Sequence, residues 1–505
     1  MRQPRHASAL VSEALNVPDP ADQPMPEDDA VECPKPSRFG FMFPKLQTKE
    51  ALLPEGPETI RALVKLGKTM IDKEPENNAF NSTIPAIYTY FGQFIVHDMT
   101  FDPKTAVRLF EEDVESLTPF TVEEIEKFEN PRSGLLDLDS VYGPILENEK
   151  CYPVPRVGDK MKVEIAVNSN LLGTDLPRVE STPFKARIGD HRNDENLVLS
   201  QMHLAFLNAH NVVVKAGGSF DKAQELIRRR YQYLVIEDFL TKIVDKETIE
   251  SVKQYRIFNP PADGYFMPVE FSAGAFRFGH AMVRSGYFYN PIRQSVHLYE
   301  LFTMSALGSY HHLLKDWLIN WTDFLPDGAE PARNLARNLA PRLTEPLSEF
   351  LIHGITVPAN GGPPKRPILS LAVIDLIRGY LFRLPTGQAV AKFLGLTPMT
   401  DEQLLEVAAV VSPDQASVLK ETGLLQQTPL WYYVLAEAAH PQLGEGNRLG
   451  PVGGRLVASV LLEAAARSNA ALPKVEGWDP ILGKQENFNI GELLRHADVN
   501  VENLN

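Results

Sequence analysis

The feature that most constrains the fold is a succession of helical patterns separated by loops that carry many of the chain's 40 prolines. Residues 401–423 predict two short helices joined at Pro413, and residues 450–469 predict a helix entered through glycines. Strand patterns are scarce, and there is no internal repeat or linker. Helical spacing is clearest in residues 216–249, at Ala223, Leu226, Ile227, Tyr231, Leu234, Val235 and Phe239. The sequence therefore predicts a mainly α fold: one large helical domain with long loops and little strand.

Composition is that of a soluble globular protein. With 505 residues, 44% hydrophobic and 23% charged, the chain can bury a sizeable core in one large domain or two packed ones. The formal net charge is −15 and no block of Lys and Arg stands out. This argues against nucleic acid or an anionic membrane as the main partner. The sequence gives no indication of the oligomeric state.

Residues 1–37 are rich in Pro, Asp, Glu and Ala, which predicts a mobile N-terminal arm before a domain over residues 38–505. The arm has no apolar core of signal-peptide length, and no stretch approaches the length of a membrane span. We therefore expect a cytoplasmic protein without an integral membrane segment, with non-classical export as the alternative that the sequence leaves open. Cys33 and Cys151 are the two cysteines, which excludes a disulfide framework and a zinc ribbon but leaves a single pair open.

Three segments carry residues suited to chemistry, although each alone fits an ordinary core. Residues 83–103 predict a helix that ends at Pro103, with Gln93 and His97 four residues apart on one face. Asp98 is rotated by about 100° from His97 and therefore serves a different neighbour. The apolar side of this helix is expected to contain Ile84, Ile87, Tyr88, Phe91 and Ile95.

The second segment, residues 189–217, predicts a helix that Asn193 or Asp194 can cap, with Arg192 and Glu195 at its entrance. We interpret two histidines on this helix, His203 and His210, as buried structural residues.

In the third segment, residues 270–290, His280 follows Gly279, which allows a flat group to approach closely. Arg277 lies three residues earlier. A lone histidine among aromatic side chains is more often a core residue than a ligand. This segment therefore indicates a functional site only in combination with the other two segments.

In this order, the three segments resemble the motifs of the animal haem peroxidase superfamily. FGQFIVHD is similar to its distal-histidine motif, GDHRNDEN to its distal-arginine motif and AFRFGHAMV to its proximal-histidine motif. IDLIRGYLFRLP resembles a fourth run of the family, and GPVGGRLVASVLL resembles bacterial members. The resemblance extends from about residue 38 to the end. It implies a single peroxidase domain that binds haem b.

The resemblance implies that His280 holds the haem iron. The second nitrogen of the proximal histidine contacts an Asn in the family, and Asp375 stands at that position here. A carboxylate should make the imidazole more electron-rich than an amide does. Arg378 matches an arginine near a haem propionate, and Arg277 is expected at the same rim.

On the open side of the haem, the resemblance gives His97 the task of moving a proton of hydrogen peroxide to the leaving oxygen. An imidazole pKa near ~6.5 suits this role. Arg192 would stabilise charge on the departing oxygen, and Gln93 would orient water or a small anion. The ferryl haem so formed would oxidise a second substrate. The family's substrates include halides, thiocyanate and phenols.

Mammalian members bind haem covalently through side chains that are mostly missing here. Val96 replaces an Asp that forms one ester, and Asn196 replaces a Met that forms a sulfonium link. Glu195 remains available for an ester. The resemblance therefore implies haem that is non-covalent or singly esterified, with iodide, bromide or thiocyanate as more plausible donors than chloride.

The family also has a calcium site beside the distal helix. The matching residues here supply oxygen ligands on a short loop, which suits a hard cation, whereas an acidic turn is the simpler interpretation. The expected ligands are Asp98, the Ser133 hydroxyl, the Leu135 carbonyl, Asp137 and Asp139.

Two other functions compete with a peroxidase. Haem-dependent fatty-acid dioxygenases of the superfamily carry a radical-forming Tyr three residues before the proximal histidine, and Arg277 occupies that position here. A non-catalytic haem-binding protein would not need His97, Gln93 and Arg192 together. The sequence therefore favours a peroxidase that takes hydrogen peroxide and a small reducing substrate.

Overall fold

The structure is a computed structural model that describes residues 29–102, 114–147, 149–165, 174–178, 186–261, 264–305, 313–326, 331–347, 370–468 and 478–497. Most of the predicted N-terminal arm, residues 1–28, lies outside the described residues. The last part of the arm is attached to the domain: Val31 forms a β-bridge with Cys151, and Cys33 forms a disulfide with Cys151. The cysteine pair that the sequence left open is therefore present.

Helices dominate the described residues, which confirms the mainly α prediction. The first eight are α2 (Pro57–Thr69), α3 (Ile87–Met99), α5 (Val122–Lys127), α6 (Asp139–Tyr142), α7 (Leu197–Lys215), α8 (Phe220–Tyr233), α9 (Leu240–Ile243) and α10 (Lys246–Gln254). The others are α11 (Leu298–Thr303), α12 (Leu371–Leu381), α13 (Gly387–Phe393), α14 (Asp401–Val411), α15 (Pro413–Thr422), α16 (Leu430–Ala439), α17 (Pro451–Arg467) and α18 (Ile490–His496).

The strands in the described residues are short and form small sheets. The one three-stranded sheet among them places β1 (Ser37–Gly40) between β11 (Phe266–Pro268), which is parallel to it, and β4 (Glu129–Asn130), which is antiparallel. The remaining strands pair two by two: β2 (Ile71–Asp72) with β15 (Leu343–Thr344), β3 (Asn81–Pro85) with β14 (Leu335–Arg337), β5 (Ile145–Glu147) with β6 (Lys150–Tyr152), β7 (Arg156–Val157) with β8 (Lys160–Met161), β9 (Glu164–Ile165) with β10 (Thr174–Asp175), and β12 (Gly286–Tyr287) with β13 (Val296–His297).

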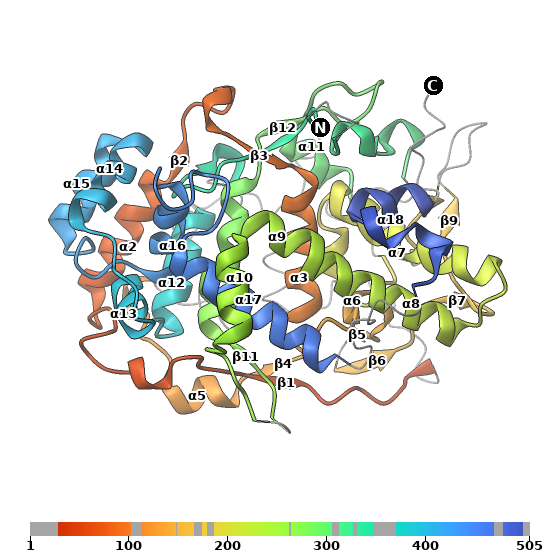
Figure 1. Cartoon of the computed structure of the whole chain (residues 1–505), viewed down its shortest axis with the longest axis horizontal. Helices are drawn as coiled ribbons and strands as arrows, with labels where there is room; N and C mark the ends of the chain where they lie inside the picture. The colour runs from red at the N-terminus through yellow and green to blue at the C-terminus, as the bar shows by residue number, and fades with distance from the viewer. Residues whose placement is uncertain are drawn as a thin grey trace, which may run out of the picture.

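Helix α3 lies near the middle of the molecule (Figure 1). It packs against α7, which also contacts α8 and α18 on the right-hand side of that view. Helices α2, α12, α14 and α15 gather on the left-hand side, and α17 lies against α10 and α16. The central position of α3 explains why it is apolar on nearly every side, because a helix without a solvent face needs no polar stripe.

The structure confirms several predicted helices and changes the bounds of others. The joint at Pro413 separates α14 from α15, as predicted, and α17 begins after Gly450. The helix predicted in 216–249 is α8, which continues into α9 through a π-helical turn, η6 (Leu234–Phe239). Ile84 was wrongly placed in a helix: it belongs to β3, because a residue that precedes a proline, here Pro85, is disfavoured in the α region and adopts extended backbone.

Two predicted helix ends also differ. Helix α3 ends at Met99, and Pro103 lies outside the described residues. Neither Asn193 nor Asp194 caps α7, because both lie in a preceding 3-10 helix, η5 (His191–Asp194). The cap is Asn196, whose side chain accepts from the backbone N–H of Leu199. Because Asn196 provides the cap, the side chain of Asn193 is available to contact His97.

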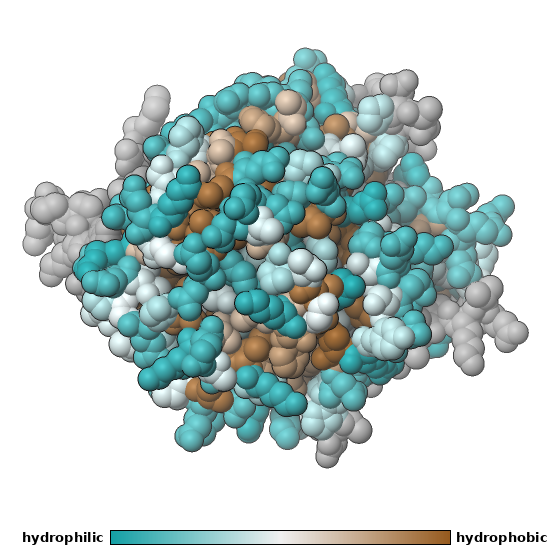
Figure 2. All heavy atoms as spheres, turned by 60° about the vertical axis from the view of Figure 1, so that its left-hand side comes forward, coloured by the Kyte–Doolittle hydropathy of each residue, from teal (hydrophilic) through white to brown (hydrophobic). Residues whose placement is uncertain are grey.

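The face shown in Figure 2 is largely hydrophilic, with hydrophobic residues interspersed among polar ones. Within the described residues, one helix, α7, is long and apolar enough to cross a membrane by length and composition. Of its most apolar window, 78% is buried inside the protein.

Candidate active site

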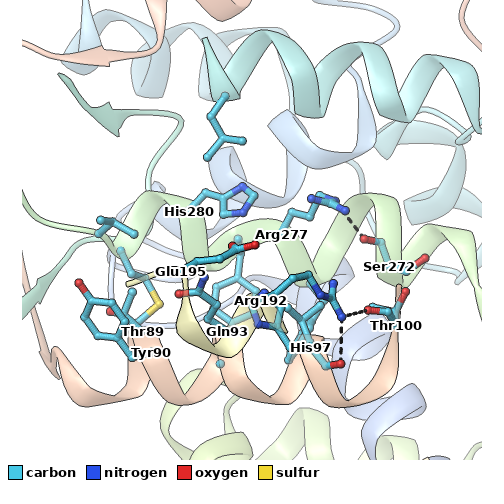
Figure 3. Close-up of a pocket in the computed structure, with 18 of the residues that line it drawn as sticks. Thr89, Tyr90, Gln93, His97, Thr100, Arg192, Glu195, Ser272, Arg277 and His280 are labelled. Carbon is cyan, nitrogen blue, oxygen red and sulfur yellow. Dashed lines mark hydrogen bonds between the residues drawn. The ribbon is translucent and has the colours of Figure 1, made fainter. Parts of the chain in front are cut away.

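A cavity beside α3 brings together most of the predicted site residues. Its space, including the open mouth, is about 1410 Å³. His280 lies on one side of the cavity, and His97 and Gln93 lie on the other, on α3 (Figure 3). Arg192, Glu195 and Arg277 also line it, whereas Asp375 and Arg378 are buried in α12 behind the His280 side.

His280 is positioned by an irregular segment in which a π-helical turn, η7 (Glu270–Gly274), runs into a 3-10 helix, η8 (Ala275–Met282). Its Nδ1 lies 2.5 Å from Oδ2 of Asp375. The second ring nitrogen, Nε2, is thereby left for the cavity. A side-chain carbon at Gly279 would meet no atom within 4 Å, so the cavity is open beside this residue, as the sequence predicted.

The carboxylate of Asp375 is fully buried and surrounded by positive groups. Nη1 of Arg277 lies 3.4 Å from its Oδ1, and Nη1 of Arg378 lies 3.6 Å from the same oxygen. Burial opposes ionisation, but His280 and these two arginines hold the pKa of Asp375 below its usual value. Asp375 is therefore an ionised acceptor for the Nδ1–H of His280.

Arg378 is buried, and within the described residues its Nε and Nη1 have no hydrogen-bond partner. Its nearest further carboxylate is Asp102, which lines the cavity with Oδ2 4.0 Å from Nε. A buried guanidinium with two unused donors is suited to an additional anion. Sequence reasoning did not single out Asp102, although it lies only five residues after His97.

On the opposite side, His97 is buried and its Nδ1 lies 2.9 Å from Oδ1 of Asn193. Burial, together with the positive charge of Arg192, lowers the pKa of His97 to about 3. The expected value near ~6.5 is therefore not what this environment gives. The imidazole is neutral at physiological pH, so one ring nitrogen carries a lone pair that can accept a proton.

Arg192 is held in place by four groups. Its Nε and Nη2 donate to the carboxylate of Asp190, and Nη2 also donates to the backbone carbonyls of His97 and Thr100. Its guanidinium lies over the ring of Phe101, 4.6 Å from the centroid. Because these groups fix the side chain, the positive charge reaches the cavity in a set orientation.

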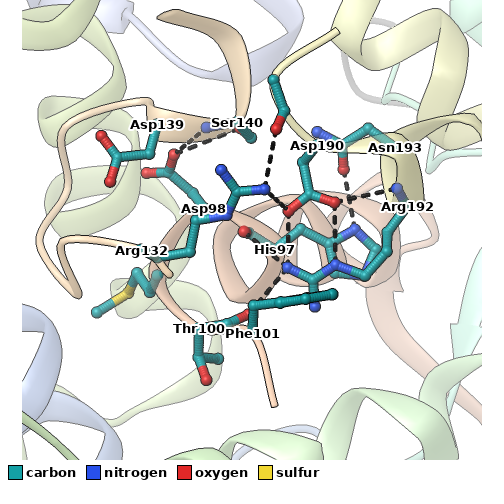
Figure 4. Close-up of polar contacts among 12 residues, drawn as sticks. His97, Asp98, Thr100, Phe101, Arg132, Asp139, Ser140, Asp190, Arg192 and Asn193 are labelled. Carbon is teal, nitrogen blue, oxygen red and sulfur yellow. Dashed lines mark hydrogen bonds and ion pairs between the residues drawn. The ribbon is translucent and has the colours of Figure 1, made fainter. Parts of the chain in front are cut away.

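Asp190 is a site residue that sequence reasoning missed. It lies between the guanidinium groups of Arg132, at 2.5 Å, and Arg192, at 2.7 Å (Figure 4). Burial opposes ionisation, but both arginines hold the pKa of this carboxyl well below its usual range. Its position two residues before Arg192, inside the distal-arginine motif, was the available signal.

Gln93 and Glu195 complete the distal side. Oε1 of Gln93 accepts from the side-chain amide of Asn196 at 3.3 Å, which links α3 to the start of α7. The backbone carbonyl of Glu195 accepts from the hydroxyl of Ser305, and its side chain reaches the cavity. Val96 lines the cavity as well, at the position where an ester is impossible.

The predicted calcium ligands lie together next to α3. Both carboxylate oxygens of Asp98 accept from backbone N–H groups, Oδ2 from Leu138 at 3.2 Å. Oδ1 accepts from Ser140 at 3.0 Å (Figure 4). Burial and the nearby Asp139 raise the pKa of Asp98 to about 8. Burial and Asp139 also raise the pKa of Asp137, whose Oδ1 has no hydrogen-bond partner within the described residues.

The fit to calcium is incomplete. The hydroxyl oxygen of Ser133 accepts from the N–H of Leu135, and Asp139 accepts from the N–H of Ser133. Each of these bonds uses one lone pair of an oxygen that a cation would also bind. Across the described ranges, no group of three or more His, Cys, Asp or Glu side chains has the arrangement of a metal site. Calcium binding therefore stays a prediction.

The fold and the cavity define a class: mainly helical proteins in which a histidine–carboxylate pair faces a second histidine and an arginine across a buried cavity. The animal haem peroxidase family matches residues 119–442, more than half of the chain. The chain belongs to this family, whose members hold haem.

Among relatives, a peroxidase-like protein of Margaritifera margaritifera is 28% identical over 182 residues, which cover 31% of this chain and 22% of that protein. Thyroid peroxidase of Canis lupus familiaris is 25% identical over 274 residues, which cover 51% of this chain and 27% of that protein. The matched segments thus span about a quarter of the length of these relatives.

Two solved structures share the fold at low identity. Peroxidase A of Dictyostelium discoideum has a TM-score of 0.55 and 16% identity, covering 93% of this chain and 91% of that chain. A fatty acid alpha-dioxygenase of Oryza sativa has a TM-score of 0.53 and 12% identity, covering 93% and 79%. Both results concern the fold alone.

Several observations of the cavity fit haem. His280 directs Nε2 into the cavity while its Nδ1 contacts a carboxylate, the usual arrangement for a histidine that binds a metal. The space beside Gly279 is open. Arg378 has two unused buried donors for an anionic substituent. His280, Asp375 and Arg378 are therefore the residues suited to hold the group.

Proposed function

We propose that this protein is a haem peroxidase, which reduces hydrogen peroxide and oxidises a small reducing substrate. The observation that carries the proposal is the placement of His97, Arg192 and Gln93 across one cavity from His280. Bound haem would supply the iron at which peroxide is reduced and the oxidising equivalents passed to the donor. The protein's own part is to hold the group, move a proton and stabilise charge.

His97 is the proton carrier in this proposal. Asn193 accepts at Nδ1, which leaves Nε2 of the neutral ring free to take a proton from peroxide in the cavity. Its low pKa makes the protonated ring a strong acid, so the proton is readily returned to the leaving oxygen. The positive charge of Arg192, fixed by Asp190, stabilises negative charge that develops during this transfer.

The reducing substrate is proposed to be iodide, bromide, thiocyanate or a phenol. Gln93 supplies an amide beside His97, and its oxygen is engaged by Asn196, so its N–H groups are the donors that remain to orient water or an anion. Glu195 is proposed as the one position for an ester to haem, since Val96 has no carboxylate. At most one covalent link follows.

A fatty-acid dioxygenase is the alternative within the superfamily. Position 277, where such enzymes are expected to carry a Tyr, holds Arg277, whose Nε donates to the carbonyl of Ser272. Tyr88 lines the cavity, but its hydroxyl donates to Asp238 at 2.7 Å. Tyr90 also lines the cavity, but it lies on α3, on the side of His97, and not three residues before His280. Position 277 therefore holds no phenolic O–H, which favours peroxide chemistry.

The proposal is tested by steady-state oxidation of iodide, bromide, thiocyanate and a phenol by haem-loaded protein and hydrogen peroxide. Oxygen uptake with a long-chain fatty acid is measured in parallel. Peroxide-dependent turnover of at least one donor, without fatty-acid-dependent oxygen uptake, is the expected result. Oxygen uptake with fatty acid and no donor oxidation would instead support the dioxygenase, and neither activity would support a non-catalytic haem protein.

We also propose that calcium binds beside the distal helix, at Asp98, Ser133, Leu135, Asp137 and Asp139. Support comes from the mutual repulsion of the buried carboxylates, which a divalent cation would relieve. Elemental analysis of active protein that has not met a chelator is expected to find about one calcium per chain. Active protein without calcium would overturn this part of the proposal.

A further inference from the structure

A buried amide joins two histidines behind the distal wall of the cavity. Oδ1 of Asn193 lies 2.9 Å from Nδ1 of His97, and Nδ2 of the same amide lies 3.0 Å from Nδ1 of His203. His97 is on α3, Asn193 on η5 and His203 on α7. Asn193 and His203 have no exposed surface, and His97 is 7% exposed, so water does not compete for these bonds.

The chemistry of an amide links the protons on the two rings. An amide oxygen only accepts and an amide nitrogen only donates. In the orientation shown by the structure, Nδ1 of His97 must therefore carry a proton, and Nδ1 of His203 must be bare. Each neutral ring has one proton, so Nε2 of His97 is bare on the cavity side and Nε2 of His203 is protonated.

The opposite orientation of the Asn193 amide would reverse the tautomers of both histidine rings. Nε2 of His97 would then carry the proton and could not accept one from a ligand in the cavity. The orientation of one side chain thus decides whether His97 is a base or a donor towards the cavity. Asn193 alone among the three residues can set this, because it contacts both rings.

The neighbouring residue fixes the backbone at the same point. Arg192 donates from Nη2 to the carbonyl of His97 at 3.0 Å, while Asn193 contacts the ring of His97 (Figure 4). Two consecutive residues of η5 thereby hold one histidine of α3 through its main chain and its side chain. Such a two-point attachment leaves little freedom for the ring to turn.

We propose that Asn193 is a positioning residue that fixes His97 as the Nδ1–H tautomer, so that Nε2 faces the cavity as the proton acceptor. Asn193 does not touch the reacting atoms and acts only through His97. The inference rests on the proposed peroxidase function for its consequence, but the tautomer itself can be measured without any turnover.

The first test is ¹⁵N NMR of histidine-labelled protein loaded with zinc protoporphyrin, which is diamagnetic and keeps the axial position. The signals of His97 are those lost in His97→Gln. The expected result is a protonated Nδ1 and an unprotonated Nε2 for His97, with the reverse for His203. A protonated Nε2 on His97 would overturn the proposal, whether or not the protein reduces peroxide.

The second test measures the rate of reaction with hydrogen peroxide in haem-loaded variants by stopped flow. Asn193→Leu keeps the volume and removes the acceptor, so we expect a loss of about 10–100-fold, as is typical when the partner of a functional histidine is removed. Asn193→Asp keeps an acceptor for Nδ1–H and is expected to restore most of that rate.

The matched control is Asn211→Leu. The amide of Asn211 also makes two hydrogen bonds, to the backbone of Met161, but it does not line the cavity. Its removal is expected to lower stability and leave the peroxide rate within about twofold. An undiminished rate in Asn193→Leu, or an equal loss in Asn193→Asp, would contradict the role of Asn193. Wild-type protein without any peroxide reaction would contradict the proposed function and leave the NMR result standing.

Discussion

Replacing Asp375 with Asn tests how the protein tunes the proximal histidine. The variant keeps an oxygen that can accept from Nδ1 of His280. It removes the buried negative charge that, in the wild type, lies 2.5 Å from that nitrogen. A hydrogen bond to a charged group contributes about 1–1.5 kcal/mol more than a neutral one. The carboxylate favours oxidised iron, since it makes the imidazole a stronger electron donor.

If the variant loses these ~1–1.5 kcal/mol of preference for oxidised iron, the reduction potential changes by roughly 40–65 mV for a one-electron couple. We expect the midpoint potential of haem-loaded Asp375→Asn to be more positive than that of the wild type by this amount, measured by spectroelectrochemical titration. The variant should also lose up to about 3 kcal/mol of stability, because Arg277 and Arg378 lose their shared counter-charge.

The control is Asp72→Asn, which removes another buried carboxylate that pairs with an arginine, Arg337 at 2.7 Å, but does not line the cavity. It should leave the potential unchanged. A potential that is unchanged or more negative in Asp375→Asn would refute the assignment of Asp375 as an ionised partner of the iron ligand.

Three further predictions concern the distal histidine, the link to haem and a buried carboxyl outside the cavity. His97→Ala should retain haem but react with peroxide about 10²–10⁴-fold more slowly, as measured by stopped flow; an unchanged rate would place the proton carrier elsewhere. Mass spectrometry after acid extraction should find at most one haem–protein bond, formed after peroxide turnover and lost in Glu195→Gln; two bonds in the wild type would contradict this. Burial raises the pKa of Glu437 to about 8, so its contribution to stability is present at low pH and is lost as pH rises from about 4.5 through 8; Glu437→Gln should therefore stabilise the protein against urea at pH 9 by about 1 kcal/mol or more and change little at pH 5.

The sequence predicted those parts of the site that depend on local spacing. Gln93 and His97 reach one cavity because four residues are about one helical turn. The family resemblance placed Asp375 beside His280 through the order of the motifs. In the structure, Oδ2 of Asp375 lies 2.5 Å from Nδ1 of His280. Pairings across 95 residues or more cannot be read from periodicity, so this contact could be anticipated only through the family resemblance.

The sequence could not give contacts that depend on the exact start of a helix. The sequence analysis placed the cap at Asn193 or Asp194, and only the position where α7 begins assigns the cap to Asn196. The π-helical segments η6 and η7 were not predicted either, since helical spacing over one turn does not distinguish i→i+5 from i→i+4 hydrogen bonds. The sequence also left open whether Cys33 and Cys151 pair, since two cysteines 118 positions apart carry no local signal of their distance in space.

The central claim is that His280 holds haem in a cavity built to reduce peroxide. The most direct measurement is the absorbance spectrum of haem-loaded wild type and His280→Ala, before and after one equivalent of hydrogen peroxide. We expect a histidine-ligated spectrum that changes within seconds of adding peroxide and returns when a donor is added, and we expect His280→Ala to lose that spectrum unless imidazole is supplied. A wild-type spectrum that peroxide leaves unchanged, or a normal spectrum in His280→Ala without imidazole, would contradict the account.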